Sequence, residues 1–126
     1  MRKLASSNVL NEAQLLDICP VHYAMTLLSG RWKIALLWYV HSGLNRFGLL
    51  QKKMPGITTK MLSQQLRELE ADGLITRTVF AQVPPRVDYA LTELGESLVP
   101  IFEQLHDWGE RQKQLRLPTR LPEPAV

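Results

Sequence analysis

The residue types of a cysteine hydrolase occur close together near the start of the chain. Asp17, Cys19 and His22 could supply a carboxylate, a nucleophile and a base. A base on the same helical turn as its nucleophile lacks the separate orienting element and the substrate pocket that such catalysis needs. We therefore expect the protein not to be an enzyme.

The same residues form a weak metal-site candidate. The chain has 1 cysteine and 3 scattered histidines, which cannot form a closed zinc-type ligand set within one chain. Cys19 and His22 could still contribute to a metal site shared between two subunits. We expect no structural metal and no cofactor, and a single cysteine excludes an intramolecular disulfide.

A second set of polar residues lies on one face of a predicted helix between Ile57 and Ile75. At the helical period of about 3.6 residues, three leucines share one side of this helix, and the polar residues lie opposite them. The leucines are Leu62, Leu66 and Leu69, and the polar residues are Lys60, Ser63, Gln64 and Arg67. Thr58 is positioned to cap the start of the helix, and Gly73 to end it.

The distribution of charge favours a polyanionic partner for this polar face. The net charge is only +3, but the chain has no acidic residue between Asp17 and Glu68. Basic residues lie throughout that interval: Arg31, Lys33, Arg46, Lys52, Lys53, Lys60 and Arg67. Nucleic acid is the leading candidate, and an anionic membrane surface is the second.

Neither a membrane anchor nor an export signal is expected. No apolar run is long enough to span a bilayer, and Met1 to Leu16 lacks the apolar core of a secretory signal. We expect a cytoplasmic protein with no membrane partner.

The segments around the polar face have the pattern of a helix-turn-helix. The sequence predicts one or two helices after Pro20, interrupted near Ser29-Gly30 and closed by Gly43. Their core candidates are Tyr23, Leu27, Ile34, Leu37 and Trp38. A short helix follows from about Arg46, with Phe47, Leu50 and Met54 turned inward, and a tight turn at Pro55-Gly56 joins it to the helix capped by Thr58.

A β-hairpin is expected directly after this motif. Leu74 to Phe80 and Arg86 to Thr92 alternate apolar and polar residues, as strands do. Between them, Pro84-Pro85 stiffens an extended loop, so the hairpin tip should protrude as a wing.

The C-terminal region predicts a long helix that pairs two copies of the chain. Apolar residues recur after the Thr92 cap at helical spacing: Leu94, Leu98, Ile101, Leu105, Trp108 and Leu115. Pro100 should kink this helix or remove one of its hydrogen bonds. Because the stripe is long for so small a domain, we expect Leu98, Ile101, Leu105 and Trp108 to form a dimer interface.

These elements give a mainly α fold with a small β-hairpin wing, in which dimerisation helices flank a winged helix-turn-helix. The expected organisation is an N-terminal arm with a helix within Leu10 to Ile18 (residues 1–18), the domain with its dimerisation helix (19–113) and a flexible tail (114–126).

Collinear motifs resemble the HxlR family of bacterial winged helix-turn-helix transcription regulators. They are Cys19-Pro20, Gly30-Arg31-Trp32, Arg46-Phe47, "PGITTKMLSQQLRELEADGLITR", "VPPRVDYALTELGESLVPI" and Trp108-Gly109. The resemblance implies a homodimer that binds an inverted-repeat operator, which would associate it with the bacterial nucleoid through DNA. We expect this regulator to act as a repressor. This chain departs from the family pattern at Leu49, where an acidic residue is usual, and at Ser29, where a glycine is frequent.

Each polar residue of the motif then has an expected role on double-stranded DNA. The residues expected in the major groove are Thr59, Lys60, Ser63, Gln64 and Arg67. Thr58 and the helix N-terminus would hold a phosphate, and Arg46, Lys52 and Lys53 would contact the backbone. Arg86 would approach the adjacent minor groove from the wing. The alternative is a winged-helix module that binds RNA or another protein.

Two further hypotheses concern regulation. Resemblance to thiol-sensing relatives makes Cys19 a candidate redox sensor, with its thiolate favoured near a helix N-terminus and beside His22. The alternative is a small buried packing residue. A small-molecule effector could bind among aromatic residues, although such residues more often belong to the core: Tyr23, Trp32, Trp38, Phe47 and Trp108.

Overall fold

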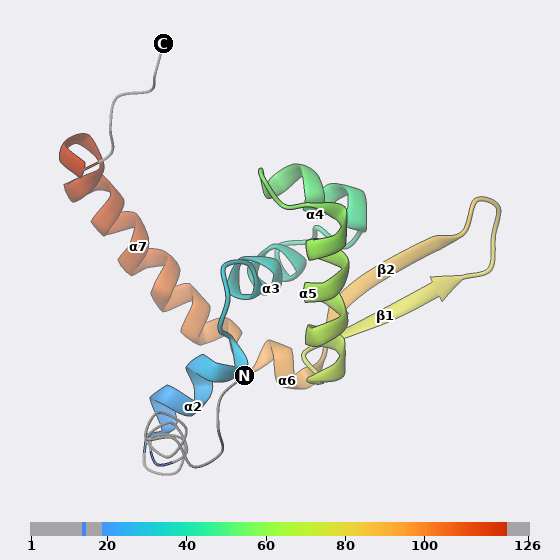
Figure 1. Ribbon diagram of the computed structural model, residues 1–126, viewed down its shortest axis with the longest axis horizontal. Coiled ribbons are helices and arrows are strands. Elements are labelled where there is room, and N and C mark those ends of the chain that lie inside the picture. The colour runs from blue at the N-terminus through green and yellow to red at the C-terminus, as the bar shows by residue number, and fades with distance from the viewer. Residues whose placement is uncertain (1–13, 15–18, 121–126) are drawn as a thin grey trace, which may run out of the picture. The chain divides into compact units, whose positions relative to one another are not determined.

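The computed structural model describes Gln14 and residues 19–120. The described chain is mainly helical, with one antiparallel pair of strands (Figure 1). This composition matches the predicted fold class. The described chain separates into two compact units, which divide between Ala35 and Leu36.

In the first unit, helix α2 (Pro20–Leu27) begins at Pro20, as predicted. The helix contains no buried residue, and the predicted core residues Tyr23 and Leu27 are 54% and 43% exposed. Their prediction as core was wrong, because apolar character identifies a face to be covered but not whether the same chain covers it. The helix predicted within Leu10 to Ile18 lies outside the described residues, apart from Gln14.

Helix α3 (Lys33–His41) follows a break at Gly30, whose φ of 107° lies in the left-handed region. Leu36, Leu37 and Val40 are buried, which confirms Leu37 as a core residue. Ile34 and Trp38 are only half-buried. The Trp38 ring instead stacks on His106, with centroids 5.2 Å apart.

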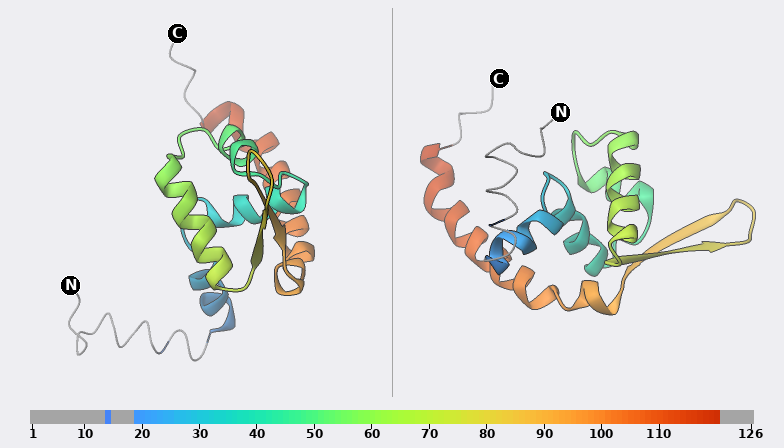
Figure 2. Two further views of the ribbon diagram at one scale, coloured as in Figure 1. Left: turned by 90° about the vertical axis from the view of Figure 1, so that its right-hand side faces the viewer. Right: turned by 60° about the horizontal axis from the view of Figure 1, so that its bottom comes forward.

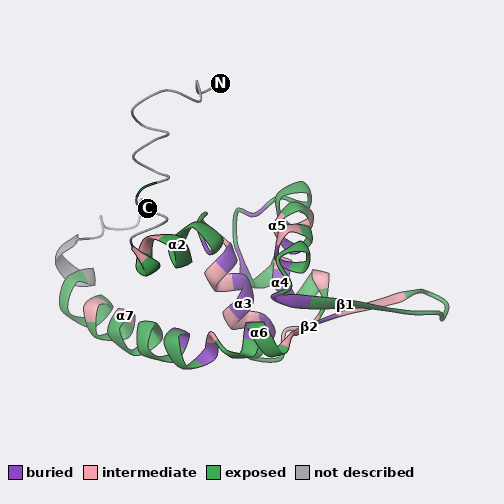
Figure 3. Cartoon of the chain, turned by 90° about the horizontal axis from the view of Figure 1, so that it is seen from below, coloured by how far each residue is buried: buried purple, intermediate pink, exposed green. Residues whose placement is uncertain are grey.

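Helices α4 (Phe47–Lys53) and α5 (Thr59–Ala71) form the predicted helix-turn-helix. Leu50 and Met54 of the α4 segment are buried, as are Leu62, Leu66 and Leu69 of α5. Ile57, in the connection between the helices, is buried as well. These contacts hold one face of α5 against the core and leave its other face available (Figure 3).

The wing consists of β1 (Ile75–Phe80) and β2 (Arg86–Leu91), paired antiparallel from Ile75 with Leu91 to Phe80 with Arg86. Figure 2 shows the hairpin extending away from α4 and α5. Its base is anchored by buried Ile75 and Tyr89, and the Tyr89 amide donates to the Asn45 carbonyl oxygen at 2.8 Å. The rest of β1 is exposed.

The C-terminal region forms two helices, where one helix kinked at Pro100 was predicted. Thr92 caps only the short α6 (Glu93–Glu96), and α7 runs from Val99 to Arg120. Pro100 therefore lies in the first turn of α7, where a missing amide hydrogen removes no helical bond. Helix α7 extends beyond residue 113, where the tail was predicted to begin, and residues 121–126 lie outside the described residues.

Candidate nucleic-acid interface

Both ends of α5 are fixed by local hydrogen bonds that the sequence predicted. The Thr58 hydroxyl accepts from the Met61 amide at 3.1 Å. At the other end, Gly73 has a φ of 76°. The Gly73 amide donates to Glu70 at 3.0 Å and the Leu74 amide to Leu69 at 2.9 Å, which satisfies the last carbonyls of the helix. Both ends of α5 are thus capped, so the helix can hold its polar side chains in fixed positions.

The polar face of α5 divides into two sets. Thr59, Lys60 and Gln64 are exposed and lie outside the groove between α5 and the wing. Ser63 and Arg67 instead line a groove between α5 and the wing, together with Glu70. Helical spacing placed Lys60, Ser63, Gln64 and Arg67 on one face, but it does not show where a neighbouring hairpin lies.

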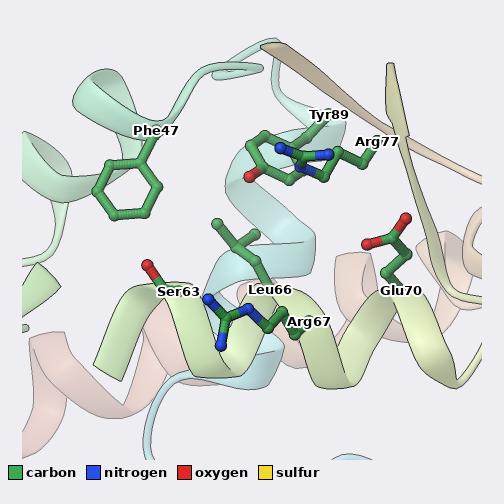
Figure 4. Close-up of a pocket in the computed structure, with 7 residues that line it drawn as sticks. All are labelled: Phe47, Ser63, Leu66, Arg67, Glu70, Arg77 and Tyr89. Carbon is green, nitrogen blue, oxygen red and sulfur yellow. The ribbon is translucent and has the colours of Figure 1, made fainter. Parts of the chain in front are cut away.

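The groove between α5 and the wing has a volume of about 310 Å³. Figure 4 shows Arg77 of β1 and Tyr89 of β2 standing opposite the residues of α5, with Phe47 at the end nearer Ser63 and Glu70 at the other. Leu66 contributes an apolar part of the lining. Sequence reasoning assigned no role to Arg77.

The lysines outside α5 differ in how far their side chains are exposed to solvent. Lys52 and Lys53, in the last turn of α4, are exposed, and the Lys53 ammonium lies 6.0 Å from the centre of the Tyr39 ring. Lys33 is buried and only 9% exposed. It therefore does not belong to the outer basic face.

Arg46 and Arg86 meet at one carboxylate. Their Nε atoms lie 3.5 Å and 3.4 Å from the same oxygen, Oδ1 of Asp88. The Arg86 guanidinium also lies 4.0 Å from the centre of the Phe80 ring. Asp88 was missed by sequence reasoning, although its place one residue before Tyr89 on β2 puts it on the strand that reaches the start of α4. It partly neutralises both arginines and joins the wing to the motif.

An apolar face of α7 is exposed along its length. Ile101, Leu105 and Trp108 are 55%, 48% and 55% exposed, whereas Leu98 is half-buried. The three exposed residues line a shallow depression of about 490 Å³ with Gln104 and Arg111. Phe47 and Trp108 line different cavities.

Cys19 occupies the N-cap position of α2. Its half-buried Sγ accepts a hydrogen bond from the His22 amide at 3.4 Å. Cys19 is therefore neither fully buried nor fully exposed.

Within the described part of the chain, no three His, Cys, Asp or Glu residues gather as a metal site would require. None of the described helices is both long and apolar enough to cross a membrane.

A model of the HxlR-like helix-turn-helix family matches residues 27–116. The chain belongs to the HxlR family. The match spans the segment from the end of α2 to the described part of α7, and thus the helix-turn-helix, the groove, the wing and the exposed apolar face. This HxlR protein is a transcriptional regulator of the helix-turn-helix type.

Similar proteins agree with this assignment. The HTH-type transcriptional regulator YdeP of Bacillus subtilis is 47% identical over 95 residues, which are 75% of this chain and 74% of YdeP. Among solved structures, the redox regulator HypR in its reduced form has a TM-score of 0.72 at 44% identity, covering 76% of this chain and 95% of HypR. Reduced YodB of B. subtilis has a TM-score of 0.61 at 33% identity, over 80% of this chain and 97% of YodB. The likeness to these structures confirms the winged helix-turn-helix fold.

Proposed function

We propose that this HxlR regulator acts as a homodimeric repressor that binds double-stranded DNA at an inverted-repeat operator. The observation that carries the proposal is the outward face of α5, which is polar and basic and lies beside a protruding wing. Helix-turn-helix proteins insert such a second helix into the major groove. Because the helix ends are capped internally, presenting these side chains to DNA requires no unfolding of α5.

On DNA, the exposed set on α5 would read base edges. Gln64 can pair with adenine through both of its amide atoms, and Lys60 can donate to guanine. The α5 N-terminus at Thr58 and the ammonium groups of Lys52 and Lys53 would contact phosphates. Arg86, stacked on Phe80, would accompany the wing into the neighbouring minor groove, while Arg46 approaches the backbone.

Dimerisation through α7 would bring two such surfaces onto one duplex. The exposed Ile101, Leu105 and Trp108 leave an apolar face that a second copy of the chain can cover. Helix α2 has no buried residue and exposes Val21, Tyr23, Met25 and Leu27. We assign its apolar surface to the same dimer.

Selection from a random duplex library at near-physiological salt tests this function. The expected result is enrichment of an inverted repeat, because a two-fold protein dimer meets two equivalent half-sites. A folded dimer that enriches no sequence, whether its Cys19 is reduced or oxidised, would contradict the proposal. Binding of single-stranded or structured RNA in preference to the duplex would favour the alternative interaction module.

Substitution of Lys60 separates its two candidate roles. If Lys60→Gln relaxes the preference at one base pair of the selected site, Lys60 reads a base. If the substitution instead flattens the dependence of affinity on salt by about one unit per protomer, Lys60 meets a phosphate. An unchanged preference together with an unchanged slope would contradict both roles.

We further propose that Cys19 makes this binding responsive to oxidants. The proposal is supported by the half-buried Sγ at the start of α2 and by the similarity to a regulator named for redox control. It is also supported by diamide-treated YodB, which has a TM-score of 0.58 at 33% identity over 75% of this chain and 94% of that one. Because the chain has 1 cysteine, a disulfide formed on oxidation would join Cys19 to Cys19 of a second copy or to the thiol of another molecule. The two thiols lose two electrons and two protons to the oxidant as the disulfide forms.

A further inference from the structure

The groove between α5 and the wing lies where one strand of bound DNA must pass. Adjacent major and minor grooves of a duplex are separated by a single sugar-phosphate strand. A protein with a helix in the major groove and a wing in the neighbouring minor groove therefore straddles that strand. In this chain, the space between those two elements is the cavity of about 310 Å³.

Guanidinium groups line both walls of this groove. Arg67 comes from α5 and Arg77 from β1, so they approach from opposite sides (Figure 4). Both residues are exposed, and within the described part of the chain neither belongs to an ion pair. This distinguishes them from Arg46 and Arg86, which share the Asp88 carboxylate. Unpaired guanidiniums on facing walls suit an anion, and a guanidinium can bond two phosphate oxygens at once.

The remaining lining suits a sugar more than a base edge. The Ser63 hydroxyl offers another hydrogen-bond donor on the α5 wall, while Phe47, Leu66 and Tyr89 contribute apolar surface. A deoxyribose presents an apolar face beside each phosphate, so one sugar-phosphate unit matches this combination.

We infer that the groove holds one sugar-phosphate unit of the straddled strand, with Arg67 and Arg77 gripping its phosphate. This inference rests on the proposed DNA-binding function and refines it. Arg77 becomes a DNA contact, and Arg67 moves from the base-reading set to the backbone set. Base reading is left to the outward residues Thr59, Lys60 and Gln64.

Glu70 should weaken the binding of a phosphate by Arg67 and Arg77. Its carboxylate lies in the same groove as Arg67 and Arg77 and repels a phosphate that enters between them. Replacing the carboxylate by an amide of the same shape should therefore tighten DNA binding.

The first test compares the salt dependence of Arg77→Gln, Arg77→Lys and Lys113→Gln on the selected duplex. Lys113→Gln is the matched control, because it removes the same charge from exposed α7, away from the groove. Arg77→Gln should weaken binding roughly tenfold and flatten the slope of log affinity against log salt by about 0.9 per protomer. Arg77→Lys should keep the slope, since its charge remains. Equal slopes for Arg77→Gln and the wild type would overturn the inference.

The second test uses Glu70→Gln and a duplex with a neutral methylphosphonate between the major-groove and minor-groove contacts. Glu70→Gln should bind a few times more tightly than the wild type, a gain that damage to the fold cannot produce. The methylphosphonate should weaken the wild type roughly tenfold and leave Arg77→Gln nearly unaffected. Equal weakening of both proteins, or no gain from Glu70→Gln, would overturn the inference while leaving the proposed function intact. Failure of the wild type to bind any duplex would overturn both.

Discussion

The side-chain amide of Gln51 on α4 donates a hydrogen bond to the hydroxyl oxygen of Thr59 on α5, at 3.1 Å. Thr59 is the first residue of α5, so this bond ties the start of α5 to α4. In the proposed complex, the two helices would therefore approach DNA as one body, oriented by a polar contact as well as by their buried leucines. The Thr59 hydroxyl can still donate its own hydrogen to a base or phosphate.

A double-mutant cycle tests this contact. Gln51→Met and Thr59→Val should each lower the free energy of unfolding by less than about 1 kcal/mol, because the hydrogen bond is exposed. The double variant should cost less than the two single changes together, since both remove the same bond. Denaturant unfolding of the four proteins measures the coupling. Additive effects would mean that the two side chains do not interact in solution.

Gly95 is a point where the packing of α6 allows no side chain. A Cβ atom there would overlap the backbone carbonyl oxygen of Leu74 and lie 3.3 Å from the Leu91 Cβ. Gly95→Ala should therefore destabilise the protein by about 2 kcal/mol or more, because the base of the wing must shift.

Gly48→Ala is the control for this substitution. Gly48 lies within α4, and a Cβ atom there meets nothing within 4 Å. The added methyl group should leave stability unchanged or raise it by up to about 1 kcal/mol through helix propensity. Thermal unfolding compares the two variants, and similar melting temperatures for both would show that α6 does not pack closely against the strand ends.

The local elements of the motif were predictable from the sequence because their signals are local. The limits and the buried face of α5 follow from its own residues, which are Thr58, Gly73 and its leucines. Pro84-Pro85 likewise marked the wing tip. The family resemblance added the fold and the class of regulator, which the comparisons then confirmed.

Features that depend on contacts between distant segments were not predictable. Helical spacing placed Arg67 beside Gln64, but only the position of β1 shows that Arg67 faces Arg77 across a groove. The break between α6 and α7 was not predicted, because the apolar spacing continues unbroken through it. Tyr23 and Leu27 were misassigned because helical spacing identifies an apolar face without showing whether that face is buried.

The exposed apolar face of α7 can be tested as the dimer interface. Leu105→Glu should raise the dimer dissociation constant on the order of a hundredfold, because a carboxylate would have to be buried in an apolar interface. Gln114→Glu adds the same charge at an exposed position on the far side of the helix and should leave the dimer intact. Sedimentation analysis reports both outcomes. A Leu105→Glu protein that remains fully dimeric would place the interface elsewhere.

The proposed role of Cys19 can be tested by oxidation of the protein on its operator. Diamide should release the wild-type protein from its operator, and Cys19→Ser should stay bound under the same treatment, because no other cysteine exists in the chain. Mass analysis without reductant should find a disulfide with a second copy or with a free thiol in the wild type. Release of Cys19→Ser by diamide would exclude sensing through this thiol, and Cys19 would then act only in packing.

Hydroxyl-radical footprinting of the dimer on its selected duplex tests the central claim most directly. The account predicts two equivalent protected regions whose centres lie about one helical turn, roughly 10 base pairs, or a multiple of it apart. Each region should include the backbone strand between a major groove and the neighbouring minor groove, where α5 and the wing would straddle it. A single unpaired footprint, or protection confined to one groove, would contradict a symmetric dimer that reads DNA with α5 and the wing together.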